Sequence, residues 1–210
     1  MRDIAERHKV KDLDKLKKLA LFYGAHFTRT LSFNKIMKIK EFSLSLDSIH
    51  RFSHFFEGSF LVYFLQRFSY SLKNQIQADR KVYFADNGLR NAISFRFSHD
   101  YGKLLENALY LHLRQKGEDL YYFAEKQEVD FIVKRGLSVS ELINVCYDIE
   151  DKETLEREKG ALIEGMKYFG LKESTLITGE SEEKAIVEKG FTIRVIPFCQ
   201  WALTENRSPR

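Results

Sequence analysis

The segment between Glu128 and Cys146, EVDFIVKRGLSVSELINVC, constrains the fold of this chain more than any other feature of the sequence. Short apolar runs lie on both sides of Gly136, and runs of this length separated by a glycine are typical of strands joined by a turn. The segment therefore predicts a strand that carries Asp130, a turn at Gly136, and a second strand that ends near Cys146.

The flanking pattern extends these strands into a larger α/β domain over residues 101–203. A helical pattern, YGKLLENALYLHLRQKG, precedes the strand LYYFAE, and a long amphipathic helix from about Glu153 to Phe169 follows the strand ELINVCYD and ends at Gly170. Two further strands are predicted in STLITGE and FTIRVIPF. This αβββαβ order with a final strand predicts an α/β sandwich with a mixed sheet, which is the core order of the PD-(D/E)XK, or restriction-endonuclease-like, fold.

A nuclease of that type carries Asp on one strand and Glu-x-Lys on the next. The carboxylates hold Mg²⁺, which activates a water molecule, and the lysine offsets the developing negative charge. Here Asp130 is present, but Asn144 and Cys146 lie in the positions of Glu and Lys, on the same face of the strand. An amide is a poorer Mg²⁺ ligand than a carboxylate, and a neutral thiol does not replace an ammonium group. We therefore predict a degenerate and inactive nuclease-like site.

Other carboxylates contribute less to this predicted site. Glu106, on the preceding helix, is a candidate further ligand, so the predicted site consists of Asp130, Glu106, Asn144 and Cys146. Glu141 has the opposite strand parity from Asn144 and should face away unless a bulge intervenes. Asp130 is a weak candidate metal ligand, and the alternative is a structural role in which it bonds nearby backbone or a basic residue. No cofactor is expected, and Mg²⁺ is the one candidate.

Residues 1–85 show a different pattern, which predicts a winged helix. Asp12 can cap a helix that stops at Gly24, and Ser32 can cap a short second helix. A third helix begins near Leu46, and its spacing predicts four inward residues, Ile49, Phe52, Phe56 and Phe60. Strand-like runs around 62–68 and 81–84, separated by a polar connection, predict a basic hairpin. Three helices followed by such a hairpin are typical of a winged helix. Residues 86–100 are predicted to be a connection and residues 204–210 a tail.

Charge is distributed unevenly between the two predicted domains. Residues 1–85 contain 16 Lys and Arg against 8 Asp and Glu, whereas residues 86–210 contain 18 against 22. Only the first domain is therefore expected to favour a polyanion such as DNA. Because the outward residues of the third helix include Asp47 and Glu57, we expect phosphate contacts rather than base recognition. The predicted nucleic-acid-binding residues are Arg51, Lys73, Arg80 and Lys81.

Several runs carry a resemblance to a known family. KVYFADNGLRNA, YGKLLENALYLHL, LYYFAEKQEVDFIV, ELINVCYDI and ETLEREKGALIEGMKYFG are similar to the C-terminal half of the archaeal-type AAA+ ATPases. The resemblance extends from RDIAERHKV to about Trp201. It implies a winged helix followed by a nuclease-like domain of unassigned function. A branch of that family with a QVCYD-like ending is similar to NVCYD here, which implies that the missing lysine is a trait of the branch.

The sequence also limits the classes of function. No G-x-x-x-x-G-K-[ST] occurs, so no ATPase activity is expected from this chain. Cys146 and Cys199 match neither a zinc spacing nor a disulfide framework, and no apolar run approaches the roughly 20 residues of a membrane span, so a cytoplasmic protein is expected.

Three hypotheses remain. The first is a non-catalytic nucleic-acid-associated or adaptor module, with DNA, an ATPase module or another protein as partner. The second is a metal-dependent nuclease that uses Asp130 with Glu106 or Asn144. The third is a protein-interaction module that does not bind nucleic acid.

Overall fold

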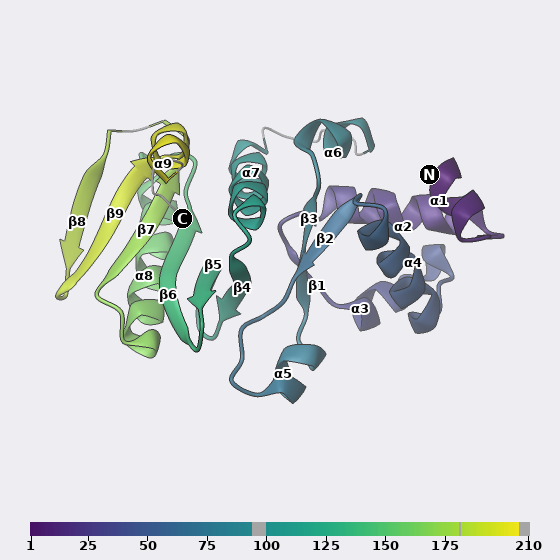
Figure 1. Ribbon diagram of the computed structural model, residues 1–210, viewed down its shortest axis with the longest axis horizontal. Coiled ribbons are helices and arrows are strands. Elements are labelled where there is room, and N and C mark those ends of the chain that lie inside the picture. The colour runs from purple at the N-terminus through teal and green to yellow at the C-terminus, as the bar shows by residue number, and fades with distance from the viewer. Residues whose placement is uncertain (94–99, 181, 206–210) are drawn as a thin grey trace. The chain divides into compact units, whose positions relative to one another are not determined.

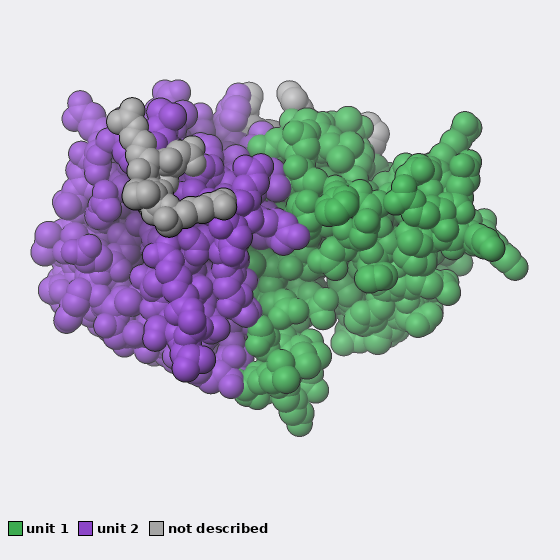
Figure 2. All heavy atoms as spheres, viewed as in Figure 1, with its two compact units in different colours: residues 1–66, 71–99 green, residues 67–70, 100–210 purple. Residues whose placement is uncertain are grey.

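The computed structural model describes residues 1–93, 100–180 and 182–205. The chain divides into two compact units, coloured separately in Figure 2. Unit 1 comprises residues 1–66 and 71–99, and unit 2 comprises residues 67–70 and 100–210. The predicted connection at 86–100 contains a helix over Asn87–Ile93, and its residues 94–99 lie outside the described part of the chain, as do residues 206–210 of the predicted tail.

Unit 1 is mainly helical and carries a small sheet of strand order β1-β3-β2, in which both pairs are antiparallel. Its elements are α1 Arg2–Arg7, α2 Leu13–Ala25, β1 Thr30–Leu31, α3 Phe33–Met37, the 3₁₀ turn η1 Lys40–Phe42, α4 Leu46–Gly58, β2 Val62–Leu65, α5 Leu72–Gln77, β3 Arg80–Phe84 and α6 Asn87–Ile93.

The two long helices of unit 1 begin where their capping residues predict. Asp12 accepts a hydrogen bond from the Lys15 N–H at 3.1 Å, and Ser45 accepts one from the Ser48 N–H at 3.2 Å. Such bonds satisfy backbone donors that the first helical turn leaves without partners. The buried faces of α2 and α4 meet through a hydrogen bond of 2.7 Å between Tyr23 Oη and Ser53 Oγ.

The expectation for Phe60 is wrong, and helix α5 was not predicted. Phe60 is 68% exposed rather than inward, because α4 ends at Gly58 and Phe60 adopts a left-handed backbone with φ 55°, which breaks the helical period. The predicted polar connection between the strands contains a helix, α5, capped by Ser71. The inward positions of Ile49, Phe52 and Phe56 are confirmed.

Unit 2 is an α/β domain with a mixed sheet, as predicted, and the sheet has six strands (Figure 1). The strand order is β4-β5-β6-β7-β9-β8, with parallel pairs β6–β7 and β7–β9 and antiparallel pairs elsewhere. Its elements are α7 Tyr101–Gln115, β4 Asp119–Ala124, β5 Glu128–Arg135, β6 Ser138–Val145, α8 Lys152–Phe169, β7 Glu173–Thr178, β8 Lys184–Glu188, β9 Phe191–Pro197 and α9 Phe198–Glu205. The prediction missed β8 and α9.

Helices cover the sheet of unit 2. Helix α8 packs through Leu162 and Met166 against a core that includes Leu142 of β6. Gly165 permits this approach, since a Cβ atom there would lie 3.0 Å from Leu142 Cδ1. Helix α7 brings the Tyr110 ring to 6.3 Å from the ring of Phe131 on β5. With the two helices packed in this way, the first turns of α8 and the N-terminal part of α7 lie beside the start of β5 and the end of β6.

Candidate functional site

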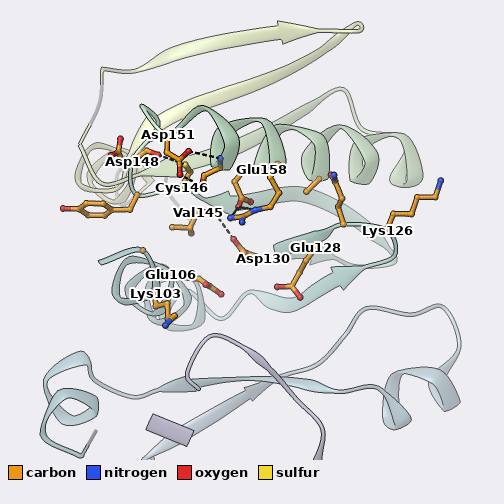
Figure 3. A pocket seen from close by; sticks show the side chains of 16 residues that line it. Lys103, Glu106, Lys126, Glu128, Asp130, Val145, Cys146, Asp148, Asp151 and Glu158 are labelled. Carbon is orange, nitrogen blue, oxygen red and sulfur yellow. Dashed lines mark hydrogen bonds and ion pairs between the residues drawn. The ribbon is translucent and has the colours of Figure 1, made fainter. Parts of the chain in front are cut away.

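A cleft of about 750 Å³ in unit 2 lies beside the ends of β5 and β6, and we call it the strand cleft (Figure 3). Helix α7 and the first turns of α8 contribute to its walls. Its lining includes the charged side chains of Lys103, Glu106, Lys126, Glu128, Asp130, Asp148, Asp151, Arg157 and Glu158. Both signs of charge are therefore present in one open cleft.

Asp130 is tied to the neighbouring strand by two hydrogen bonds. Its backbone N–H donates to Asn144 Oδ1 at 3.1 Å, and its Oδ2 accepts from the Val145 N–H at 3.0 Å. The regular pairing of β5 with β6 extends only to Phe131 and Ile143, so these side chains bond the backbone beyond that pairing. One carboxylate oxygen of Asp130 is thus engaged by the chain itself.

Asn144 lies beneath the cleft and does not line it. Its side chain is fully buried, and its Nδ2 donates to Glu158 Oε2 at 2.6 Å. Because Oδ1 accepts from Asp130, this amide links the strand acid to the helix acid. The strand position at which the sequence analysis looked for a second carboxylate therefore holds a buried amide that bonds two other groups of the protein.

Glu158 is a buried carboxylate that the sequence analysis did not single out. Arg157 donates to its Oε1 through Nε at 3.1 Å and Nη2 at 2.7 Å. Burial raises the pKa of Glu158 above its ordinary value, and the nearby charge of Asp130 raises it further, while Arg157 and Asn144 oppose the shift. Figure 3 shows Asp130 and Glu158 approaching one another from β5 and α8. We call Asp130, Asn144, Arg157 and Glu158 the strand-cleft network.

Periodicity along α8 contained the signal for Glu158. The buried residues Ala161 and Leu162 follow it by three and four positions, so Glu158 lies on the apolar face of the helix. A carboxylate in such a position needs hydrogen-bond or ion-pair partners, because burying an unpaired charge costs on the order of several kcal/mol.

Cys146 lines the cleft but offers it no charge. Its thiol donates to the Asp148 carbonyl oxygen at 3.1 Å. Burial, reinforced by the charge of Glu158, raises the pKa of Cys146 to about 11. The group in the position expected for lysine is therefore a neutral thiol at pH 7.

Glu106 projects from α7 into the same cleft as Asp130, whereas Glu141 does not line it. Glu141 Oε1 accepts from Thr175 Oγ1 at 3.1 Å. Lys103, the cationic residue nearest to Glu106 along α7, pairs with Asp100 at 2.8 Å. Within the described residues, no group of three or more His, Cys, Asp or Glu side chains is arranged to hold a metal ion.

The residues predicted to contact nucleic acid all belong to unit 1, but they differ in exposure. Arg51 on α4 and Lys73 on α5 are exposed. Arg80 is half-buried, with its guanidinium carbon 5.8 Å from the centre of the Phe33 ring. Lys81 is 1% exposed, so it does not present its ammonium group to solvent.

No helix in the described part of the chain combines the length and the hydropathy needed to cross a membrane.

Comparison with known proteins finds similarity to uncharacterized relatives. Residues 1–100 match a family model described as a domain of unknown function (DUF8612). The chain is 34% identical over 216 residues to an uncharacterized protein of Methanocaldococcus jannaschii, a match that covers 97% of this chain and 47% of that protein. It is 25% identical over 207 residues to an uncharacterized protein of Haemophilus influenzae, covering 97% and 49% respectively. The chain thus spans about half the length of these relatives. No solved structure matches it.

Proposed function

We propose that this chain is a non-catalytic nucleic-acid-associated or adaptor module with a degenerate nuclease-like site. The observation that carries the proposal is the strand-cleft network. Asp130 Oδ2 accepts from Val145, Glu158 Oε2 accepts from Asn144, and Glu158 Oε1 accepts from Arg157. These oxygens bond protein donors, where a working nuclease would direct carboxylate oxygens to Mg²⁺.

The order of elements supports the fold assignment within this proposal. In unit 2 the sequence α7, β4, β5, β6, α8, β7 follows the αβββαβ order of the PD-(D/E)XK fold, with β9 as the final strand. In unit 1 the helices α2, α3 and α4 precede an antiparallel pair formed by β2 and β3, which is the order of a winged helix. We therefore propose a winged-helix unit followed by a PD-(D/E)XK-like unit.

We also propose a relationship to the C-terminal part of AAA+ ATPases, with an ATPase module or another protein as a partner. The support is the sequence resemblance together with the length of the two relatives, which are about twice as long as the matched region. An adaptor in this arrangement would contact nucleic acid through unit 1, in which Arg51, Lys73 and Arg80 lie outside the core.

The catalytic part of the proposal is tested by titrating the purified chain with Mg²⁺ and with Mn²⁺ in a calorimeter, beside a plasmid-cleavage assay. We expect no metal-dependent cleavage and no saturable metal binding. Asp130→Ala serves as the matched control. Cleavage by the native chain that is lost in Asp130→Ala would overturn the proposal.

One observation favours the second candidate, a metal-dependent nuclease. Asp130 and Glu106 line the same cleft, and the Asp130 charge acts on Glu158, so acidic side chains from β5, α7 and α8 line one cleft. A nuclease that binds its metal weakly would cleave only at high Mn²⁺ concentration. Cleavage that rises with Mn²⁺ and disappears in both Asp130→Ala and Glu106→Gln would favour this candidate.

Nucleic-acid association is tested with a fluorescent DNA duplex and anisotropy over a range of salt concentrations. Phosphate contacts give a linear fall of log affinity with log salt, with a slope of about −0.9 for each contact. We expect Lys73→Gln with Arg80→Gln to make this slope less steep. No binding by the native chain at low salt, together with binding to a protein partner, would support the protein-interaction hypothesis instead.

A further inference from the structure

A second hollow, in unit 1, has a composition unlike that of the strand cleft. It encloses about 390 Å³ between the turn that joins α1 to α2 and the N-terminal half of α4. Its basic side chains are His8, Lys9, Lys11, Lys15 and Arg51, and its one acidic side chain is Asp12. We call it the basic pocket. With His8 neutral, four positive charges stand against one negative charge.

The single acid of the basic pocket already has partners. Asp12 accepts the Lys15 N–H at the start of α2, and its Oδ2 lies 3.3 Å from Lys15 Nζ. This pair offsets one cation. Within the described residues, no carboxylate lies within ion-pair distance of Lys9, Lys11 or Arg51. The remaining charge of the pocket is therefore positive and is not neutralised by the described chain.

The turn that carries Lys9 and Lys11 is held firmly against α4. The His8 ring stacks on Phe55 with 3.9 Å between ring centres and 7° between planes. The Val10 N–H donates to the Ala5 carbonyl at 2.8 Å, which closes the turn at the end of α1. Lys9 itself has φ 50°, a left-handed conformation that is uncommon for a residue other than glycine, asparagine or aspartate. These contacts hold the backbone that carries the two lysines in one conformation beside α4.

Residues at the N-termini of two helices, α2 and α4, also line the pocket. Asp12 is the N-cap of α2 and Lys15 lies in the first turn of that helix, while Ser48 lies in the first turn of α4. Both helices have 13 residues, and the N-terminus of a helix carries a partial positive charge. The apolar side chains of Leu44 and Phe52 also line the hollow, and low-dielectric walls strengthen the field that an anion meets.

We propose that the basic pocket binds phosphate oxygens, with Lys9, Lys11 and Arg51 as the contacting cations. The ligand expected here is a phosphate of a nucleic-acid backbone, in which case the inference rests on the proposed function and adds a second contact region to it. A free phosphate or phosphate ester presents the same oxygens. The two sources are separated by the experiment.

The variant for the test is Lys9→Gln, Lys11→Gln, Arg51→Gln, which we call the pocket variant. Its matched control is Lys35→Gln, Lys38→Gln, Lys40→Gln, which removes the same charge from exposed positions in unit 1 that do not line the pocket. A DNA duplex is titrated with each protein by anisotropy at several salt concentrations. We expect the pocket variant to lose at least tenfold in affinity at low salt and the slope to become less steep by about 2 to 3, while the control changes both far less.

Inorganic pyrophosphate is titrated separately into ¹⁵N-labelled native protein and followed by NMR. We expect saturable shifts confined to the amides of residues 8–15 and 44–52, absent in the pocket variant. If duplex binding is unchanged in the pocket variant and pyrophosphate shifts no pocket amide, the inference is overturned while the proposed function stands. If the native chain binds no duplex but pyrophosphate shifts these amides, the phosphate site stands and nucleic-acid association fails. Equal losses in the pocket variant and the control would show a diffuse charge effect and would also overturn the inference.

Discussion

The strand cleft of unit 2 and the basic pocket of unit 1 use charged residues in opposite ways. In the strand cleft, Asp130 and Glu158 bond an amide, a guanidinium and a backbone N–H, so their charges are compensated inside the protein. In the basic pocket, Lys9 and Lys11 are exposed and have like-charged neighbours. Both sites contain several charged side chains, so the number of charges does not distinguish them. Charged groups that bond other groups of the protein form a closed network, whereas like-charged neighbours leave a surface that can bind a ligand of opposite charge.

If the charged groups of the strand cleft are compensated within the protein, the Cys146 thiol beside them should react very slowly with alkylating reagents. The difference in labelling rate between Cys146 and Cys199 is the largest effect we expect. With a pKa of about 11, only about one Cys146 thiol in a thousand is ionised at pH 8, and the side chain is buried. Iodoacetamide should therefore label the exposed Cys199 roughly 100-fold faster than Cys146, as measured by mass spectrometry over time. In Cys199→Ser, labelling of Cys146 should be slow and should become fast on addition of urea. Equal labelling rates for the two thiols in the native chain would contradict the assignment of Cys146 to a closed network.

Removing the amide that joins the two acids should have the next largest effect. Asn144→Ala leaves buried Glu158 without one donor and the Asp130 N–H without its acceptor. We expect the free energy of unfolding in urea to fall by about 3 kcal/mol, since bonds to charged groups are worth roughly 1.5–3 kcal/mol and a neutral bond about 1 kcal/mol. The exposed Asn74→Ala on α5 is the control and should change it by less than about 0.5 kcal/mol. Similar small losses in both variants would mean that the network does not organise the cleft.

The pH dependence of stability tests the charge state of Glu158. Its pKa is raised in the folded state, first by burial and then by Asp130, so the folded protein retains this proton when the unfolded chain has lost it. The stability contributed by Glu158 is therefore full below the ordinary pKa of 4.5 and decreases as pH rises through the folded value. Glu158→Gln should gain stability relative to the native chain as pH increases from 4 to 8.

Urea unfolding at several pH values measures this difference. Glu156→Gln is the neighbouring control, because Glu156 is largely exposed and pairs with Lys159 at 2.7 Å. Its difference from the native chain should vary less with pH. A native chain that gains stability relative to Glu158→Gln as pH rises would contradict the assigned direction.

The basic pocket should show the smallest effect on folding. In the pocket variant the three changed side chains are exposed and carry like charges, so their removal should alter the free energy of unfolding by about 0.5 kcal/mol or less, with any change toward greater stability. Thermal unfolding of the variant and its lysine control measures this. A loss above about 2 kcal/mol would assign these residues to the fold and end the contrast with the strand cleft.

The hairpin of β5 and β6 and the long helix α8 were predictable because each has an unambiguous local signal. Gly136 and Gly170 both have positive φ, of 63° and 73°, and they close the turn and the helix where the sequence analysis placed these ends. Asp130 could be identified as a site residue because it belongs to a strand pattern. For Glu158 the sequence holds only a local signal, its place on the apolar face of α8 next to Arg157. Asn144 and Asp130 are 14 and 28 residues away, and only the packing of α8 on the sheet brings Glu158 to them.

Lys81 shows how a distant short element changes the role of a residue. The strand β1 has only two residues, too few for any periodicity, yet Thr30 pairs with Lys81 and makes β3 the central strand of its sheet. Lys81, which was predicted to contact nucleic acid from the basic hairpin, therefore lies in a central strand and is 1% exposed. The prediction that Phe60 faces inward was wrong for a related reason. The helical period does not reveal that α4 ends at Gly58, two residues before Phe60.

The segment 67–70 has a consequence for how the protein is made. Phe68 belongs to the core of unit 2, with its ring 5.7 Å from that of Tyr121 and 5.3 Å from that of Phe169, although the chain on both sides of the segment belongs to unit 1. During synthesis Phe68 leaves the ribosome roughly 100 residues before Phe169. Its apolar ring therefore stays exposed until the later part of the chain has been made. A protease cut near residue 100 would likewise release a C-terminal fragment that lacks one of its own core side chains, and such a fragment should aggregate where the intact chain does not.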